Sequence, residues 1–239
     1  MKVSYIITTY NRFATLVYHI KSIMLQRYFC DDLQIIVADD GSQDMTTIIA
    51  SIFKGITYVN TESRDRAWPA KARNLGIEAA TNELVIFADD DCLPHPKLLR
   101  EYQKINKGEC LVGYRSSNRQ SLAIEIDRLQ PVEYLEPGNP RAYMVRQSQG
   151  IFGHMHYTTG TCAILKADLA GARFDEEFTG YGFEDRHFGW LLSQQGLIFR
   201  FFPTAIIYHD HDSFNRSRDL KNEELIKNKE MYVRKLSGS

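Results

Sequence analysis

Three consecutive carboxylates, Asp89, Asp90 and Asp91, directly follow the apolar run from Leu84 to Ala88. The run predicts a buried strand that would deliver the three acids together at its carboxyl end. Carboxylates this close repel one another unless a cation lies among them, and oxygen ligands suit Mg²⁺ or Mn²⁺ bound to a diphosphate. Acidic turns after strands are also common on protein surfaces. The triplet alone therefore leaves a metal site and a solvated turn open.

A second pair of acids, Glu184 and Asp185, follows the glycine- and aromatic-rich stretch Gly180–Phe183. Negative charge at a helix N-terminus complements the helix dipole, which is the simplest interpretation of the pair. Glycines also let a ligand approach the backbone closely, and an aromatic face suits a sugar ring. A carboxylate held there could accept the proton of an attacking sugar hydroxyl.

Two histidines, His209 and His211, follow the apolar run Ile206–Tyr208. A histidine at a strand end is commonly a hydrogen-bonded surface residue. Imidazole is also a good ligand for Mn²⁺, and an ion held by carboxylates and a diphosphate has a coordination position left for it. We expect His209 to be the metal ligand, with His211 as the alternative.

The elements that would position these groups alternate between strand and helix in the first half of the chain. Short apolar or β-branched runs predict strands over residues 3–8, 33–39, 56–60 and 84–89. Helical spacing predicts helices between them, with Asn11 and Ser42 as N-caps and Pro69 at the first position of a third helix. This alternation is typical of βαβ units and a mainly parallel sheet.

Ligands bind at the carboxyl ends of the strands in such a sheet. The polar stretches Thr8–Asn11 and Asp39–Ser42 stand at two predicted strand ends, and the acid triplet stands at a third. We therefore expect these groups to share one rim.

The second half of the chain is less regular. Prolines and glycines interrupt the pattern between residues 117 and 156, where we expect a flexible, acceptor-facing loop. A helix over 186–195 that ends at Gly196, strands over 197–208 and a C-terminal helix carrying Leu225, Tyr232 and Leu236 are expected after it. We expect a nucleotide-sugar half at 1–96, an acceptor half at 97–215 and a charged C-terminal helix or tail at 216–239.

The composition is that of an ordinary globular protein, with 44% hydrophobic and 25% charged residues. A formal net charge of -1 supplies no broad basic field, so nucleic acid is not expected as a partner. The four cysteines form no CxxC pair, which argues against a zinc knuckle or a disulfide scaffold. We find no signal peptide and no membrane-spanning run. These features predict a cytoplasmic protein and leave peripheral membrane association open.

In order and spacing, the motifs resemble those of family 2 type glycosyltransferases with the GT-A fold. The stretches that carry this resemblance are Thr8–Asn11, Asp39–Ser42, Lys71–Ile77 and Asp89–Asp91. Residues 174–178 and 180–185 also resemble the acceptor-side segment of the β-1,4-galactosyltransferase and polypeptide N-acetylgalactosaminyltransferase families. The resemblance covers roughly residues 1–215. It implies an α/β fold: a Rossmann-like mixed sheet flanked by helices, in a single domain with two subregions.

The resemblance also implies roles on the donor side. The nucleotide pocket would be lined by Thr8, Thr9, Tyr10 and Asn11. Asp39 would accept from the uracil ring N–H of a UDP-sugar, and Arg73 would approach the base or the diphosphate. The triplet would be the DXD motif, with Asp89 and Asp90 near the nucleotide. The divalent cation, Mn²⁺ or Mg²⁺, would be held by Asp91, Asp89 and His209.

On the acceptor side, the resemblance makes Asp185 the catalytic base and lets Glu184 hold acceptor hydroxyls. Two departures matter. Tyr181 and Arg186 stand where the galactosyltransferases have a Trp and a third acid, so the identity of the acceptor does not transfer. Ile206 stands where that family has a methionine ligand, so the metal would carry more water.

The implied reaction is inverting transfer of a sugar from a UDP-sugar to a hydroxyl of a glycan, glycolipid or peptide, in glycan or polysaccharide biosynthesis. A retaining GT-A glycosyltransferase and a non-catalytic nucleotide-sugar- or carbohydrate-binding module are alternatives. A sugar nucleotidyltransferase would need a Gly-rich, basic phosphate loop after the first strand, and Thr8–Asn11 is not such a loop.

Overall fold

The computed structural model describes residues 1–63, 67–116, 154, 157–209 and 218–237. Its strands are β1 (Lys2–Thr9), β2 (Asp32–Asp39), β3 (Ile56–Asn60), β4 (Leu84–Asp89), β5 (Cys92–Pro94), β6 (Glu109–Ser116), β7 (Cys162–Leu165) and β8 (Ile198–His209). Within the described residues they form one eight-stranded sheet in the order β3-β2-β1-β4-β7-β6-β8-β5. The fold is therefore α/β with a mixed sheet, as expected.

The first half of the sheet is parallel. β1 lies in its middle and pairs with β2 and β4, and β2 pairs with β3. The four strands predicted from apolar runs are confirmed, each to within a residue or so. Their apolar character follows from burial on both faces, since helices cover the sheet on either side.

The second half mixes directions. β7 runs antiparallel to both β4 and β6, β6 and β8 are parallel, and β5 is antiparallel to β8. The register of β6 against β8 shifts between Gly113 and Tyr114. The strands expected over 197–208 are one continuous strand, β8.

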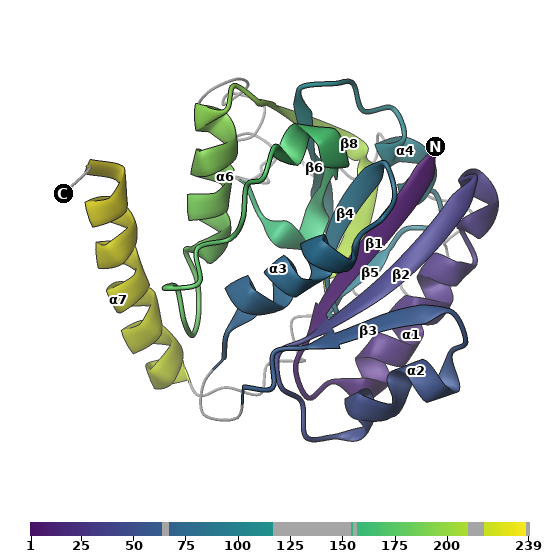
Figure 1. Ribbon diagram of the computed structural model, residues 1–239, viewed down its shortest axis with the longest axis horizontal. Coiled ribbons are helices and arrows are strands. Elements are labelled where there is room, and N and C mark those ends of the chain that lie inside the picture. Colours follow the sequence, from purple (N-terminus) through teal and green to yellow (C-terminus); the bar gives the residue numbers. More distant parts are fainter. Residues whose placement is uncertain (64–66, 117–153, 155–156, 210–217, 238–239) are drawn as a thin grey trace.

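The helices are α1 (Phe13–Met24), α2 (Ile49–Ile52), α3 (Pro69–Ala79), α4 (Leu98–Tyr102), α6 (Glu184–Gln194) and α7 (Arg218–Ser237). α1 and α4 pack into one apolar core on one face of the sheet, and α3 and α6 into a second core on the other (Figure 1). Each fully buried Leu, Ile or Phe side chain contributes roughly 1.5–3 kcal/mol. These two cores fix the helices against the sheet whose strand ends carry the polar motifs.

The expected N-caps are wrong, because Asp44 replaces both: it caps its own short helix by accepting from the Thr46 N–H at 2.9 Å and also caps α1 from across the strand ends. α1 begins at Phe13, whose N–H donates to Asp44 Oδ2 at 3.0 Å. Asn11 adopts a left-handed φ of 51°, and its N–H donates to Ser42 Oγ at 2.8 Å. The Ser42 hydroxyl in turn donates to Asp39 Oδ1 at 2.6 Å. At α1, tertiary hydrogen bonds have thus replaced the local capping that the sequence suggested.

The C-terminal helix α7 lies at the margin of the molecule beside α6 (Figure 1). Asn228 on α7 is fully buried, and the Tyr232 ring lies 5.4 Å from that of Phe183. Leu225, which we expected to pack on the body, lies against Gly182, although 36% of its surface is exposed. The sequence suggested that an apolar face holds α7. The buried Asn228 and the contact between the Tyr232 and Phe183 rings also help to hold it.

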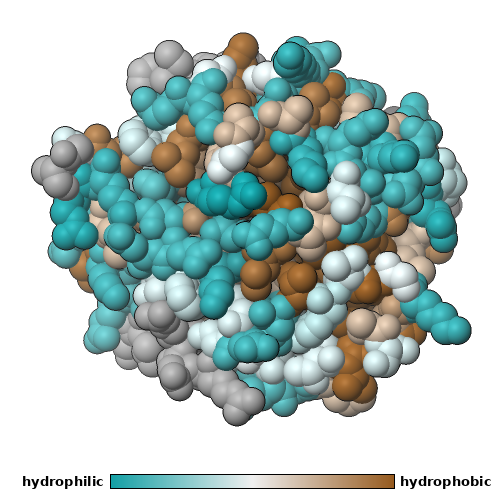
Figure 2. Space-filling view, in the orientation of Figure 1, coloured by the Kyte–Doolittle hydropathy of each residue, from teal (hydrophilic) through white to brown (hydrophobic). Residues whose placement is uncertain are grey.

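Polar side chains dominate the face seen in Figure 2, and apolar ones are exposed in a band across its middle. No helix among the described residues is long and apolar enough to cross a membrane. The acceptor-facing loop expected over 117–156 lies outside the described residues, except for residue 154. His211 also lies outside them.

Candidate functional site

A cavity of ≈ 460 Å³ opens at the carboxyl ends of β1 and β4, facing the start of α6 and the end of β8. Its volume is within the usual range for small-ligand sites. The cavity is lined by every residue predicted for the site except Asp39, namely Thr8, Thr9, Tyr10, Asn11, Arg73, Asp89, Asp90, Asp91, Glu184, Asp185 and His209. Residues far apart in the sequence are therefore brought to one cleft, while their individual roles stay predictions.

Asp39 lies below the cleft, with none of its surface exposed. Its Oδ1 accepts from the N–H and the hydroxyl of Ser42, at 2.9 and 2.6 Å. Its Oδ2 accepts from the Tyr58 hydroxyl at 2.5 Å and from Asn60 Nδ2 at 3.2 Å. Four donors fill the capacity of a carboxylate. Direct contact with a uracil N–H would thus require one of these donors to leave, and the neighbouring Asp40 is the acid that lines the cleft.

The acid triplet has three different environments. Asp89 pairs with Arg73 at 3.1 Å. Asp90 is buried and accepts from the Thr9 hydroxyl at 2.7 Å. Burial raises the pKa of Asp90 to about 7, although the charge of Arg12 opposes this. Asp91 lies 3.0 Å from Arg12, so each of the three acids has a cationic or hydroxyl partner that offsets the repulsion between them.

A group of potential metal ligands forms around Asp91. Within the described residues, Asp91, Cys92 and His209 offer ligand atoms that all lie within 4.8 Å of one another. Asp91 Oδ2 is 3.6 Å from His209 Nε2. Burial alone would raise the pKa of Asp91, but the contacts with His209 and the charge of Arg12 hold it well below its usual value. The Asp91 carboxylate suits Mn²⁺ or Mg²⁺, the His209 imidazole suits Mn²⁺ better than Mg²⁺, and the thiol of Cys92 is too soft a ligand for either ion.

The expected metal set is only partly assembled. Asp91 and His209 meet because β5 pairs with β8 in a register that sets Cys92 opposite His209. Asp89 is not in this group, since its carboxylate is turned to Arg73. Ile206 packs with Tyr114 and Tyr208 in a small apolar cluster and supplies no ligand.

Arg73 joins the two sides of the cleft. Its side chain is buried on α3, and its guanidinium contacts Asp89 at 3.1 Å and Glu184 at 2.8 Å. The guanidinium also lies 5.6 Å from the Phe174 ring. Arg73 was expected to approach the nucleotide, but both of its terminal nitrogens are engaged by protein carboxylates.

Asp185 is the second residue of α6, which begins at Glu184 directly after Phe183, a residue with a left-handed φ of 71°. Loss of water around the carboxylate, and then the charge of Glu184, raise the pKa of Asp185 to about 7, while Arg73 opposes the rise. A carboxylate with this pKa can accept a proton near neutral pH. Such perturbed groups in clefts are typical of functional sites.

Two arginines that line the cleft were not predicted. Arg12 directly follows the Thr8–Asn11 motif, a position that could have marked it as a candidate. Arg115 lies on β6 beside Ile207 of β8. Among the described residues, Arg115 Nε has no hydrogen-bond partner. Without the expectation of a strand at β6, nothing in the sequence pointed to Arg115.

Comparisons with known proteins identify the family and the fold of the chain. The model of the family described as Glycosyl transferase family 2 matches residues 4–174. Chondroitin synthase of Escherichia coli is 28% identical over 235 residues, which cover 86% of this chain and 34% of that protein. Validoxylamine A glucosyltransferase of Streptomyces hygroscopicus subsp. jinggangensis is 26% identical over 219 residues, covering 81% and 52%. The chain thus spans about a third to a half of these relatives.

Solved structures match the fold along nearly the whole chain. S. aureus TarS in complex with UDP-GlcNAc has a TM-score of 0.65 at 18% identity, covering 94% of this chain and 64% of that one. Mannosyltransferase PcManGT from Pyrobaculum calidifontis, in complex with GDP-Man and Mn²⁺, has a TM-score of 0.67 at 18% identity, covering 98% and 64%. At these identities the likeness establishes the fold, which is GT-A, as expected.

Proposed function

The chain belongs to glycosyl transferase family 2, and from this we propose that it transfers a sugar from a nucleotide diphosphate sugar to an acceptor hydroxyl. The observation that carries the proposal is the single cleft that Asp91, His209 and Asp185 line together. A donor diphosphate and an acceptor need anionic, metal-ligating and basic groups within one sugar-sized space.

The reaction we propose inverts the configuration of the anomeric carbon. Asp185 takes the proton of the acceptor hydroxyl as its oxygen forms the new glycosidic bond. The bond from the anomeric carbon to the diphosphate breaks at the same time, and the nucleotide leaves with the electron pair. The pKa of Asp185, raised to about 7 by burial, suits a base that works near neutral pH. Glu184, held by Arg73, is positioned to orient the acceptor.

Asp91 and His209 fit a divalent cation, which would offset the negative charge that develops on the diphosphate. For the donor we propose a UDP-sugar, because the motif that contains Asp39 resembles a uracil site and TarS, a structural neighbour, is described with UDP-GlcNAc. The acceptor is a hydroxyl of a glycan, glycolipid or peptide.

Replacing Asp185 by Asn tests this function. We expect Asp185→Asn to lower the rate of UDP release from the active UDP-sugar by about 10²- to 10⁴-fold, because general-base assistance is lost. UDP affinity, measured by calorimetry with Mn²⁺, should stay near that of the unmodified protein. An NMR spectrum of the product reads the anomeric configuration.

Glu78→Gln is the matched control, since Glu78 is an exposed acid on α3, the helix that carries Arg73. It should keep full turnover. Full turnover in Asp185→Asn would remove Asp185 from the mechanism. A product with retained configuration would favour the retaining alternative. Absence of UDP release with every donor tried would favour a non-catalytic binding module.

A further inference from the structure

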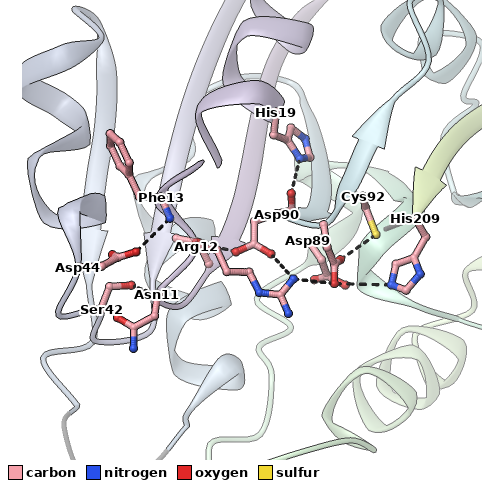
Figure 3. Close-up of polar contacts among 12 residues, drawn as sticks. Asn11, Arg12, Phe13, His19, Ser42, Asp44, Asp89, Asp90, Cys92 and His209 are labelled. Atoms are coloured by element: carbon pink, nitrogen blue, oxygen red, sulfur yellow. Dashed lines mark hydrogen bonds and ion pairs between the residues drawn. The ribbon is translucent and has the colours of Figure 1, made fainter. Parts of the chain in front are cut away.

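Arg12 forms an ion pair with Asp91, one of the candidate metal ligands of the cleft. Its Nη1 atom lies 3.0 Å from Asp91 Oδ2 and 3.5 Å from Asp90 Oδ1. The side chains are nearly enclosed, with 15% of Arg12, 7% of Asp90 and 10% of Asp91 exposed. In Figure 3 the guanidinium reaches from the segment after β1 into the space between the acids. A cation of the protein itself therefore lies on the carboxylate that would hold a metal.

The contact uses the same oxygen that faces the histidine. Asp91 Oδ2 is the atom 3.0 Å from Arg12 and also the atom 3.6 Å from His209 Nε2. A divalent cation between Asp91 and His209 would meet the guanidinium at close range. Like charges repel strongly where little water screens them. Arg12 and the metal ion therefore compete for Asp91.

A diphosphate changes this competition, because it offers Arg12 another anion. Arg12 directly follows Tyr10 and Asn11, and all three line the cleft. A guanidinium binds phosphate oxygens through two parallel hydrogen bonds. We propose that Arg12 is the resting counter-ion of Asp91 and that it exchanges Asp91 for the nucleotide diphosphate as the divalent cation binds. The inference rests on the metal-dependent function proposed above and adds the order in which its parts assemble.

Two consequences follow from this exchange. A metal ion alone binds weakly, since it must displace Arg12 from Asp91 and leaves Arg12 only its longer contact with Asp90. Metal and nucleotide diphosphate strengthen each other's binding by the same factor, because coupling between two ligands is reciprocal. If Arg12 only held the loop in place, its removal would weaken binding of the metal and the nucleotide alike. Exchange predicts instead that metal binding alone becomes stronger.

Mn²⁺ binding to the protein and to Arg12→Gln separates these two roles. Free Mn²⁺ is measured by electron paramagnetic resonance in the presence and absence of UDP. In the unmodified protein we expect UDP to raise Mn²⁺ affinity by about 5- to 150-fold, the usual range of coupling. In Arg12→Gln we expect Mn²⁺ alone to bind about tenfold more tightly and the effect of UDP to shrink, since Asp91 has no competing cation.

Two further variants serve as controls. Arg12→Lys keeps the charge and should resemble the unmodified protein in Mn²⁺ affinity. Arg186→Gln removes a charge near Asp185, where Arg186 is exposed and lies 5.0 Å from the Phe183 ring. Its affinity for Mn²⁺ alone should be unchanged, which distinguishes the contact with Asp91 from a general loss of positive charge.

Three outcomes would overturn the inference. If Mn²⁺ alone binds Arg12→Gln no better than the unmodified protein, Arg12 is not the competing ion. The metal-dependent function still stands in that case, provided that UDP and Mn²⁺ bind together. If UDP does not change the Mn²⁺ affinity of the unmodified protein, the exchange is absent, whatever the folding of the variants. If Mn²⁺ does not bind even with UDP, the metal requirement of the proposed function fails together with the exchange.

Discussion

Arg73 is the residue on which the charge balance between the two sides of the cleft depends. It is buried and contacts Asp89 from the donor side and Glu184 from the acceptor side. Removing one member of a buried ion pair leaves an uncompensated charge and is strongly destabilising. The same guanidinium lowers the pKa of Asp185, against the effects of burial and of Glu184. Arg73 thereby links donor geometry to the proton affinity of the proposed base.

This link predicts a pH dependence. Asp185 accepts a proton only as the carboxylate, so kcat/KM should rise with pH through about 7 and then level off. Below that pH each unit should cost about tenfold in rate. Loss of the Arg73 charge raises the pKa of Asp185, so Arg73→Gln should shift the midpoint to higher pH, while Arg73→Lys should shift it less. An unchanged midpoint in folded Arg73→Gln would contradict the link.

At the scale of elements, the short turn before β7 lies in close contact with the end of β4. A Cβ atom on Gly160, in the turn Thr159–Thr161, would lie 2.9 Å from Asp89 Oδ2 and 3.2 Å from Cys92 Sγ. Glycine is therefore what allows the turn to approach the carboxylate. The side chain of Asp89 keeps its orientation towards Arg73 only while this space remains free.

Gly160→Ala should consequently push Asp89 away from Arg73 and lower nucleotide affinity by about tenfold, at a cost in stability of about 1–3 kcal/mol from overpacking. UDP calorimetry and thermal unfolding measure the two effects. Gly189→Ala is the control, since its Cβ would lie 2.8 Å from Tyr157 Cβ, in the core. It should lower stability similarly but spare UDP affinity. Equal UDP affinity in both variants would show that the turn does not position Asp89.

The parallel half of the sheet could be predicted from the sequence, because each strand is an apolar run between amphipathic helices. β5 was missed because Cys92–Pro94 is too short to carry a period. β6 was missed because Gly113 and the charged Arg115 interrupt its apolar character. The caps were wrong because Asp44 takes the place of both expected residues, locally at Thr46 and across loops at Phe13, and the second contact has no local sequence signal.

The site could be predicted wherever a polar group follows an apolar strand, as with Asp91 and His209. The ion pairs of the site could not be predicted, because nothing in the local sequence indicates that Arg12 contacts Asp91 or that Arg73 contacts both Asp89 and Glu184. These partners depend on how loops and helices from separate regions pack together. The expected contact of Asp39 with the nucleotide stays a prediction for the same reason, since its buried network with Tyr58 has no sequence signature.

At the scale of the whole molecule, the C-terminal helix supports one wall of the cleft. Asn228 Nδ2 donates to the carbonyl oxygens of Thr179 at 3.1 Å, Tyr181 at 3.3 Å and Gly182 at 2.9 Å. Lys235 pairs with Asp175 at 2.7 Å and Glu177 at 2.8 Å. Tyr181 and Gly182 line the cleft just before the proposed base. The position of that wall therefore depends on α7.

Asn228→Ala should loosen the wall, because three carbonyls lose their donor at a cost of about 1–3 kcal/mol. Hydrogen exchange of the amides of residues 179–183 should accelerate, and KM for the acceptor should rise more than KM for the donor. Lys229→Ala, an exposed neighbour on the same helix, is the control and should change neither. Unchanged exchange in Asn228→Ala would mean that the wall is held without α7.

The pairing of β5 with β8 has a consequence for biosynthesis of the protein. Cys92 and His209 become neighbours only when β8 is inserted between β6 and the edge strand β5. A nascent chain released up to the start of β5 would already carry the acid triplet but would lack the imidazole. The ability to bind the metal ion should therefore appear late during translation. A fragment that ends before β8 lacks His209 and should not bind the ion as the intact protein does.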